Sequence, residues 1–253
     1  MDMFTGYDQN DLPEFFLFII DCFHNAISRE TRMTISGNIE NDIDKTAVIC
    51  YEMIKKMYSK EYSEVWNIFY AVHVSEIISI ETGKKVNITA EPFLILDLPI
   101  PVNNKSPTLI DCLNLYVEGE VLEGENAWFN EKTQKRENVR KKISFWSFPT
   151  ILVIDFKRFN YRNQKNQIPI DFPLENLNLS DYVIGYKKNS YVYDLYAVCN
   201  HSGSSLGGHY TAFVKNANNK WYLYNDTNVS EVRHPESTVI SPKAYCLFYR
   251  KRK

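Results

Sequence analysis

The sequence predicts an α+β fold, because helical and strand-like hydrophobic patterns occupy different parts of the chain. Up to about residue 70 the apolar residues recur with helical spacing, and from Ala71 onward the pattern changes to that of strands. The last third has the pattern of an antiparallel β-meander, which completes the fold class. With 253 residues, the chain is long enough for one large domain with a substantial core.

The first helix is expected to begin after Asp11, whose carboxylate makes it a good N-cap residue. Its apolar residues recur every four positions and form one stripe: Phe15, Ile19, Phe23 and Ile27. This helix should end near Glu30. A second helical stretch, with a break near Ser59, is expected from residue 46 to residue 70, and a short helix from residue 109 to residue 118.

Strands are predicted from short apolar or alternating runs bounded by turn residues. The continuous apolar run Ile151–Ile154 is typical of a strand that is buried on both faces. The charged segment 134–142 is expected to be a solvated turn or hairpin, and the glycine-rich segment 202–208 a flexible link. Four strands are expected in the last third: Tyr193–Asn200, His209–Lys215, Lys220–Tyr224 and Ala244–Arg250.

Composition excludes several classes of function. A net charge of −2 creates no field that would draw nucleic acid or an anionic membrane surface. No apolar stretch approaches the roughly 20 residues that a membrane helix needs, and the polar first ten residues are unlike a signal peptide. The five cysteines are dispersed and form no Cys-x-x-Cys pair. They favour a reducing, intracellular compartment, the cytoplasm or the nucleus, over a disulfide scaffold.

The segment from Asn200 to Ala212 carries the clearest chemical signal. His209 follows the pair Gly207-Gly208 at the start of a strand, where the glycines would let a substrate chain pass close by. Asn225 ends the next strand, and adjacent antiparallel strands would bring it beside His209. An amide oxygen that accepts from the imidazole fixes its tautomer, and a thiol on the other side becomes nucleophilic. The alternative is a structural histidine, the commoner role of a lone histidine on a strand.

The same residues resemble the histidine box of the ubiquitin-specific proteases, a family of deubiquitinating cysteine peptidases. The family pattern, roughly Tyr-x-Leu-x-Ala-Val-x-Asn-His-x-Gly-x-x-x-Gly-Gly-His-Tyr-Thr-Ala, stands here from Tyr193 to Ala212. Asp155 occupies a position where the family usually has histidine. Other segments resemble further family boxes: Tyr7–Phe15, Glu91–Pro101, Glu123–Trp128, Phe148–Phe159, Phe172–Leu179, Trp221–Thr227 and Ala244–Arg250.

The resemblance implies a papain-like hand of thumb, palm and fingers as a single domain. Residues up to about 70 would be the remainder of the helical thumb, about 71–150 the β-fingers interleaved with the palm, and about 151–253 the palm. It also implies hydrolysis of the bond at the C-terminal glycine of ubiquitin, with ubiquitin or a ubiquitinated protein as partner and no cofactor. His209 would be the general base, oriented by Asn225, and Asp226 would assist. The residues implied to bind the ubiquitin tail are these: Asp11, His201, Gly207, Gly208 and Tyr210.

Two departures from the family pattern lead to further expectations. No segment matches the family's Gly-Asn-Thr-Cys-Tyr box, so the nucleophile and the N-terminal part of the thumb are expected to be absent from this chain. Each of the five cysteines is expected to be a buried small residue instead: Cys22, Cys50, Cys112, Cys199 and Cys246. The chain is then either part of an enzyme whose nucleophile lies elsewhere, or a ubiquitin-binding pseudoenzyme.

The second departure concerns zinc. Many family members hold a zinc ion with two Cys-x-x-Cys pairs at the tips of the fingers. The corresponding positions here are Ile80, Gly83, Asn130 and Thr133, none of which is a metal ligand of that kind. No metal site is therefore expected, and strand pairing alone should hold the fingers.

Overall fold

The computed structural model describes residues 10–205 and 207–253; the first residues of the Tyr7–Phe15 box lie outside the described residues. The helices are α1 (Leu12–Ile27), α2 (Asp42–Lys60), α3 (Glu64–Phe69), α4 (Leu109–Val117) and α5 (Pro235–Thr238). The strands are β1 (Ala71–Ser79), β2 (Lys85–Phe93), β3 (Ile95–Leu98), β4 (Glu120–Leu122), β5 (Trp128–Asn130), β6 (Lys135–Glu137), β7 (Val139–Ser147), β8 (Ile151–Phe156), β9 (Leu177–Asn178), β10 (Val192–Ser204), β11 (Gly207–Lys215), β12 (Trp221–Asn225), β13 (Asn228–Val232) and β14 (Ala244–Lys251).

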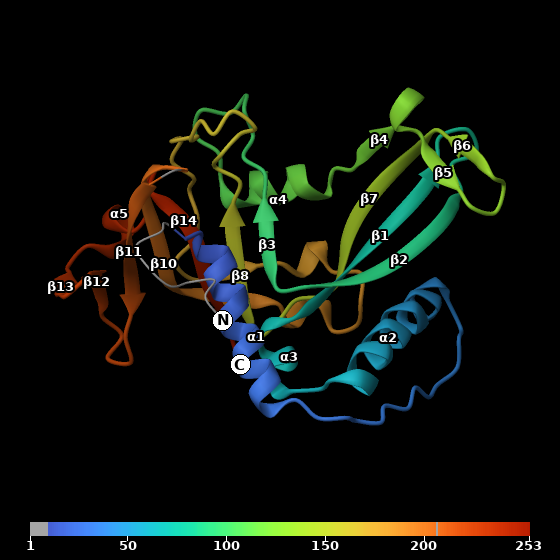
Figure 1. Cartoon of the computed structure of the whole chain (residues 1–253), viewed down its shortest axis with the longest axis horizontal. Helices are drawn as coiled ribbons and strands as arrows, with labels where there is room; N and C mark the ends of the chain where they lie inside the picture. The colour runs from blue at the N-terminus through green and yellow to red at the C-terminus, as the bar shows by residue number, and fades with distance from the viewer. Residues whose placement is uncertain (1–9, 206) are drawn as a thin grey trace.

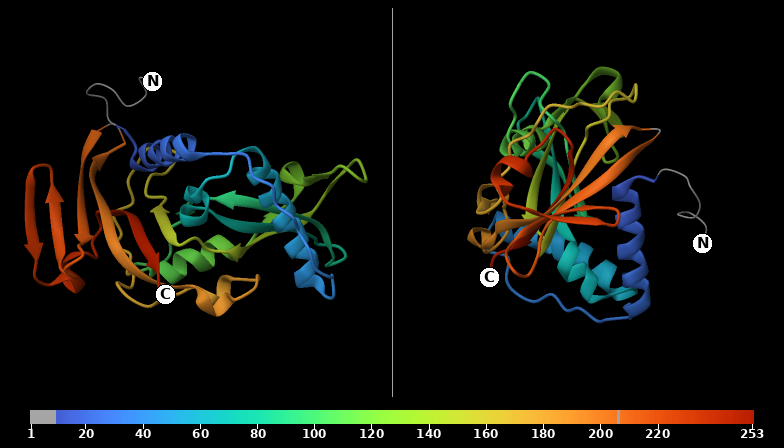
Figure 2. Two further views of the ribbon diagram at one scale, coloured as in Figure 1. Left: turned by 90° about the horizontal axis from the view of Figure 1, so that it is seen from below. Right: turned by 90° about the vertical axis from the view of Figure 1, so that its left-hand side faces the viewer.

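Two sheets form the body of the molecule, as Figure 1 shows. The finger sheet has the order β2-β1-β7-β4, and its long strands extend to the small β5–β6 hairpin. The palm sheet has the order β13-β12-β11-β10-β14-β8-β3, with β9 paired to β10. Helix α1 lies across one face of the palm sheet, and α2 lies along the finger sheet (Figures 1 and 2). The predicted α+β class is confirmed.

Helix α1 begins as predicted but turns its aromatic stripe outward. Asp11 caps it, with Oδ1 accepting from the Glu14 amide at 3.4 Å. The buried residues of the helix are Ile20 and His24, and Phe16 packs edge-on against Phe69 and Phe248. Three members of the predicted stripe are exposed instead: Phe15 by 42%, Phe23 by 60% and Ile27 by 48%. The helix therefore has a second apolar surface beyond the one that packs on the palm.

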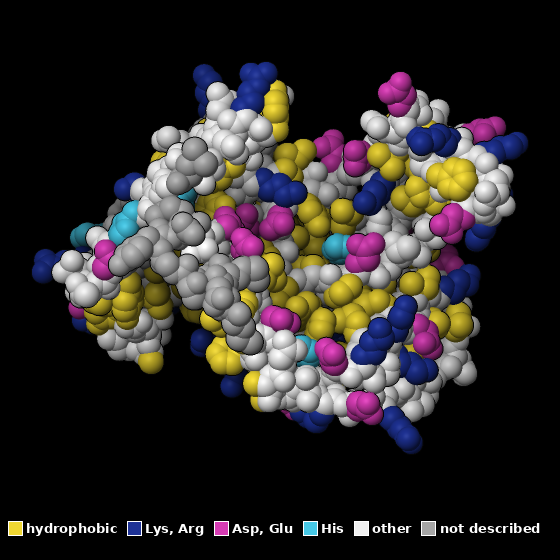
Figure 3. All heavy atoms as spheres, in the orientation of Figure 1, with side chains coloured by type: hydrophobic (Ala, Val, Ile, Leu, Met, Phe, Trp, Pro, Cys, Tyr) yellow, Lys and Arg dark blue, Asp and Glu magenta, His cyan; other side chains and the backbone are white. Residues whose placement is uncertain are grey.

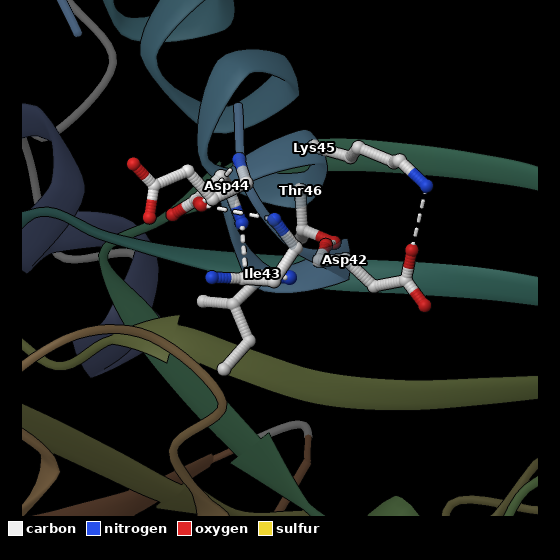
Figure 4. A network of polar contacts seen from close by, with 7 residues as sticks. Asp42, Ile43, Asp44, Lys45 and Thr46 are labelled. Atoms are coloured by element: carbon white, nitrogen blue, oxygen red, sulfur yellow. Dashed lines mark hydrogen bonds and ion pairs between the residues drawn. The ribbon is translucent and has the colours of Figure 1, made fainter. Parts of the chain in front are cut away.

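The predicted second helical stretch is two helices, α2 and α3, which separate near the expected break. Helix α2 begins at Asp42, because Asn41 forms a capping box: its Oδ1 accepts from the amides of Ile43 and Asp44 at 2.8 and 3.0 Å. The Asp44 carboxylate accepts in return from the Asn41 amide at 3.2 Å. Figure 4 shows this turn, where Lys45 also pairs with Asp42 at 2.8 Å.

The charged segment around residue 134 takes part in a hairpin, one of its two expected forms, whereas the segment predicted as a flexible link belongs to strands. Residues 131–134 form the turn of the β5–β6 hairpin, and residues 135–142 form β6 and the start of β7, where Arg140 and Lys142 are exposed. The glycine-rich link is a tight hairpin in which Ser204 pairs with Gly207. Gly203 has a φ of 123°, and a Cβ there would lie 2.4 Å from the Gly207 carbonyl oxygen. Glycine thus permits strand pairing where a flexible link was expected.

The largest cluster of buried side chains lies between the palm sheet, α4 and the loops that precede β10. Leu152, Ile154 and Phe156 of β8 are buried in it, as predicted for this strand. The opposite face of β8 carries Val153 and Asp155 toward α1. Among the described residues, no helix is long and apolar enough to cross a membrane.

We expect Asn41→Ala to destabilise the protein by about 1 kcal/mol, because the first turn of α2 loses both bonds to its cap. Urea unfolding followed by tryptophan fluorescence measures this change. Asn38→Ala is the matched control, since the Asn38 side chain makes no hydrogen bond within the described residues. Equal midpoints for the two variants would show that the cap contributes nothing.

Candidate active site

His209 and Asn225 meet across neighbouring strands of the palm sheet. The imidazole Nε2 lies 2.7 Å from Asn225 Oδ1, which confirms the predicted proximity of the two side chains. An amide oxygen accepts hydrogen bonds only, so Nε2 carries the proton and donates it. The other ring nitrogen, Nδ1, is then the basic one. His209 is half exposed, with 51% of its side chain accessible, so a reactant can reach it.

Sheet register explains why these two side chains share a face. Strands β11 and β12 pair Phe213 with Leu223, and the same antiparallel register, continued, sets Thr211 opposite Asn225. His209 is two residues from Thr211, so its side chain points to the same side as Asn225. The contact is therefore a diagonal one between neighbouring strands.

Asp226 is close to the histidine but outside hydrogen-bonding range. Its Oδ2 lies 3.9 Å from His209 Nε2, and 75% of its side chain is exposed. Asp226 stands in the two-residue turn between β12 and β13 with a positive φ of 49°. The geometry makes Asn225, and not Asp226, the direct partner of the imidazole.

A cavity of about 400 Å³ borders the glycine-rich hairpin, and its lining includes Gly208 and Tyr210, the two neighbours of His209 in β11, but not His209 itself. All five residues that the resemblance implied for tail binding line it: Asp11, His201, Gly207, Gly208 and Tyr210. Asp11 Oδ2 accepts from the Tyr245 hydroxyl at 3.0 Å, so one carboxylate both caps α1 and ties it to β14. Asp11 remains exposed at the cavity.

Gly208 keeps this cavity open. A Cβ on Gly208 would lie 2.3 Å from His201 Nε2 and 2.5 Å from the Ser202 carbonyl oxygen. Both distances are shorter than contact allows, so any side chain here would displace His201. Glycine is therefore required by close packing against the neighbouring strand.

His201 is held by a residue that the sequence did not single out. Lys165 Nζ lies 3.1 Å from His201 Nδ1 and also donates to the His201 carbonyl oxygen at 2.5 Å. Since an ammonium group only donates, Nδ1 accepts and the ring proton is on Nε2. Burial, and then the charge of Lys165, lower the pKa of His201, so it lines the cavity as a neutral ring.

Arg158 anchors the loop that carries Lys165. This buried guanidinium, 1% exposed, donates to the carbonyl oxygens of Ala244 at 2.6 Å and of Asn166 and Ile168 at 3.0 Å each. Burial lowers the pKa of Arg158 to about 10, which still leaves it charged at neutral pH. Arg158 belongs to the segment Phe148–Phe159 that resembles a family box, but the sequence alone did not predict its contacts with these carbonyl oxygens.

Asp155, which stands where the family usually has histidine, is a buried acid on the α1 side of the sheet. Only 8% of it is exposed, and its Oδ1 accepts from the Cys246 thiol at 3.1 Å. Burial, together with the charges of Asp97 and Asp11, raises the pKa of Asp155 to about 7, although the hydrogen bond from Cys246 lowers it. A thiol is a weak donor, so it compensates little of the cost of burying the charge.

Four cysteines are poor candidates for a nucleophile. Burial raises the pKa of the thiols of Cys50 to about 12 and of Cys112 and Cys199 to about 11. For Cys246, burial and the neighbouring Asp155 raise the pKa well above its usual value. All four therefore stay protonated, whereas a nucleophile needs the thiolate.

Two cysteines depart from the predicted burial: Cys199 is only partly buried, and Cys22 is exposed on α1. It comes eleven residues after Asp11, which corresponds to about 16 Å along a helix. Asp11 borders the cavity, so Cys22 lies well away from it along the helix. Exposure alone does not give this thiol a general base.

A carboxylate bridges two of the positions where zinc ligands would stand in the fingers. Asn130 Nδ2 and Thr133 Oγ1 both donate to Glu137 Oε1, at 3.0 and 2.6 Å. These hydrogen bonds, that from Thr133 first, lower the pKa of Glu137. The other two positions lie in the β1–β2 turn, where Ile80 is 50% exposed and Gly83 has a φ of 67°.

Within residues 10–205 and 207–253, no group of three or more His, Cys, Asp or Glu side chains is arranged to hold a metal ion. Two of the three remaining histidines, His24 and His73, have side-chain partners away from the cavity. His24 contacts Ser63 at 2.8 Å, and His73 contacts Glu91 at 3.3 Å on the fingers. Figure 3 shows the hollowed face between fingers and palm, with apolar side chains on its floor and acidic side chains near its middle.

Comparison with known proteins assigns this arrangement to a family. The family model described as ubiquitin carboxyl-terminal hydrolase matches residues 1–249. The chain therefore belongs to the ubiquitin carboxyl-terminal hydrolase family, and its domain is of the ubiquitin-specific protease type.

Among the relatives, ubiquitin carboxyl-terminal hydrolase 2 is 34% identical both in Homo sapiens and in Gallus gallus, over 97% of this chain. The match covers 41% of the human protein and 69% of the chicken protein. Ubiquitin carboxyl-terminal hydrolase 21 of Homo sapiens is 32% identical over 98% of this chain and 46% of its own length. The chain thus spans less than half the length of these human relatives.

The fold also resembles a chain of the SAGA DUB module that contains Ubp8, Sgf11, Sus1 and Sgf73 and is bound to monoubiquitin. The TM-score is 0.73 at 25% identity, over 98% of this chain and 50% of that chain. The module bound to ubiquitin aldehyde gives a TM-score of 0.72 at 24% identity, with the same two shares covered.

We expect Asp155→Asn to stabilise the protein above neutral pH. The folded-state pKa of about 7 lies above the ordinary value of about 3.9, so the folded state resists ionisation and wild-type stability falls as pH rises from 4 to 7. The variant should lack this loss and be more stable at pH 8 by about 2–4 kcal/mol. Urea unfolding at pH 5 and pH 8 measures it, with exposed Asp181→Asn as control. Parallel pH profiles for wild type and D155N would contradict the account.

We expect Glu137→Ala to open the β5–β6 hairpin locally, because two donors lose their common acceptor. Amide hydrogen exchange over residues 128–137 should accelerate about tenfold, while the global unfolding midpoint stays unchanged. Glu131→Ala removes a neighbouring exposed carboxylate and serves as the control. Unchanged exchange in E137A would show that strand pairing alone holds the hairpin.

Proposed function

We propose that this chain provides the general base and the tail-binding groove of a deubiquitinase, which hydrolyses the bond at the C-terminal glycine of ubiquitin. The single observation that carries the proposal is the 2.7 Å contact between His209 Nε2 and Asn225 Oδ1. It leaves Nδ1 unprotonated on a half-exposed ring, one residue along β11 from Gly208, which lines the cavity. Family membership supports the reaction class.

In the proposed reaction His209 Nδ1 takes the proton of a cysteine thiol, and Asn225 holds the ring as the imidazolium forms. The thiolate attacks the carbonyl carbon of the terminal glycine. The imidazolium then gives its proton to the departing lysine amine, which leaves a thioester. A water molecule, deprotonated by the same nitrogen, hydrolyses the thioester and regenerates the thiol. Asp226 contributes only through its charge at 3.9 Å.

The cavity at the hairpin suits the tail that would lead to this bond. A Gly-Gly terminus needs a passage without side chains on one wall, and Gly207 and Gly208 border the cavity. Asp11 places an exposed carboxylate at the same cavity and would pair with a basic residue of the tail. His201 and Tyr210, which contact each other with ring centroids 4.7 Å apart, would enclose the chain.

The proposed reaction takes its nucleophile from a segment other than residues 10–253. Four of the five thiols are held protonated by burial, and Cys22 lies far along α1 from the cavity. The exposed apolar residues Phe23 and Ile27 of α1 offer a surface on which such a segment would pack. We assign α1, α2 and α3 to the thumb, which this segment would complete.

A second candidate function is a ubiquitin-binding pseudoenzyme, favoured by the same observation about the thiols. In that case the groove would hold the tail without cleaving it. The five cysteines are all unpaired thiols, in keeping with the reducing intracellular compartment that we propose for either function.

We expect the purified chain to bind ubiquitin but to form no adduct with ubiquitin that carries a C-terminal electrophile. Co-expression with a separate segment bearing the Cys-box of the chicken relative should restore the adduct. His209→Ala should then slow its formation by at least about a hundredfold, and Asn225→Ala by about tenfold or more. Adduct formation on gels and by mass spectrometry measures both.

Matched variants on α1 test the docking surface. Phe23→Ser should impair complementation, whereas Leu17→Ser should not. Leu17 is also exposed, by 44%, but six residues of helix turn it about 120° away from Phe23. An adduct on a cysteine of the isolated chain would overturn the proposal of an external nucleophile. Tight ubiquitin binding with no adduct under any complementation would establish the pseudoenzyme.

A further inference from the structure

A basic groove lies at the end of the palm sheet opposite the histidine. It is a concavity of about 580 Å³ between the end of β14, the start of β10 and the β11–β12 turn. Its charged lining residues are Lys215, Arg250, Lys251, Arg252, Lys253 and Asp194. The chain as a whole carries a net charge of −2, so this concentration of positive charge is local.

From this arrangement we infer that the basic groove is a docking site for an acidic peptide segment of a partner protein. The inference is independent of hydrolysis, because it concerns binding at a second site. It adds a recognition surface that is separate from the glycine-lined cavity.

Ion pairing inside the chain accounts for only part of the positive charge. Arg252 Nε contacts Asp194 at 2.7 Å, and Lys215 Nζ contacts Glu175 at 3.1 Å. A further Arg252 contact reaches Glu175 at 3.9 Å. Within the described residues, the other three cations of the groove have no carboxylate partner: Arg250, Lys251 and Lys253.

Aromatic rings hold two of these cations in place. The Arg250 guanidinium lies 5.1 Å from the centre of the Tyr196 ring, and Lys251 Nζ lies 4.1 Å from that of Tyr191. Lys251 also donates to Ser190 Oγ at 3.1 Å. Cations fixed in this way lose little freedom when they bind a carboxylate. Burial lowers the pKa of Lys251, so a carboxylate beside it would relieve the cost of desolvation.

Distance allows the groove and the histidine to be used together. Six residues of β11 separate His209 from Lys215, which is about 20 Å along a strand. A partner peptide in the groove would therefore not obstruct the glycine-lined cavity. An acidic segment of the ubiquitinated protein could dock there while its modified lysine reaches His209.

The local pattern favours a peptide over a nucleic acid. Asp194 and Glu175 lie among the cations and would repel the closely spaced phosphates of a nucleic acid backbone. The carboxylates of a peptide can be spaced to meet Arg250 while avoiding those acids; Lys251, the next residue of β14, points to the other face of the sheet. Nucleic-acid binding also requires an extended basic surface, and this groove is confined to one end of the sheet.

The test uses the full chain and fluorescein-labelled ten-residue peptides of alternating Glu and Ser, or of Gln and Ser. Fluorescence anisotropy should detect the Glu peptide and not the Gln peptide. Its affinity should fall about tenfold between 50 and 300 mM NaCl. Arg250→Glu combined with Lys253→Glu should abolish binding, and the milder Arg250→Gln should weaken it at least about threefold without risk to the fold.

The control pair Lys84→Glu and Lys132→Glu makes the same change of net charge on exposed positions of the fingers. Binding of the Glu peptide by this control at wild-type affinity supports the groove. Three results would overturn the inference: an equal loss in the control, equal binding of the Gln peptide, or tighter binding of a 20-base-pair DNA duplex that the groove variants abolish. None of these outcomes depends on adduct formation with ubiquitin.

Discussion

The pairing of β10 with β11 determines where His201 and His209 lie. Ser204 opposite Gly207 sets Ser202 opposite His209 and His201 opposite Tyr210. A slip of one residue would turn His209 to the far face of the sheet, away from Asn225, and would expose His201. The close approaches at Gly203 and Gly208 hold this register, because only glycine fits between the two backbones at those points. The positions of the proposed base His209, of its contact with Asn225 and of the cavity therefore depend on this one hairpin.

Local patterns were sufficient for the elements that carry the proposed base. The alternation of side chains in β11 and β12 predicts that His209 and Asn225 face each other, since both strands are short and joined by one turn. The cap at Asp11 and the buried strand around Ile154 also follow from neighbouring residues alone. The helical and strand periods differ so clearly on either side of Ala71 that the change of structure could be placed there.

Contacts between distant residues could not be read in this way. Tyr245 meets Asp11 across 234 positions and Cys246 meets Asp155 across 91, so no local spacing records either pair. Lys165 lies in a charged loop that looks solvated in sequence, and only the carbonyls held by Arg158 bring it to His201. For α1, the sequence predicted a single apolar stripe through Phe15 and Phe23, whereas packing against Phe69 and Phe248 buries the face that carries Phe16.

The carboxylate bridge of the fingertip has a consequence for how the protein matures. A zinc site made of four cysteines forms only when the cell supplies the ion and keeps the cysteine thiols reduced. The bonds from Asn130 and Thr133 to Glu137 form from the chain itself as it folds. On this part of the surface, folding is then indifferent to zinc starvation, to chelators and to oxidants that would strip a cysteine site. Its vulnerability is acidity instead, since protonation of one carboxylate removes the charge that both donors share.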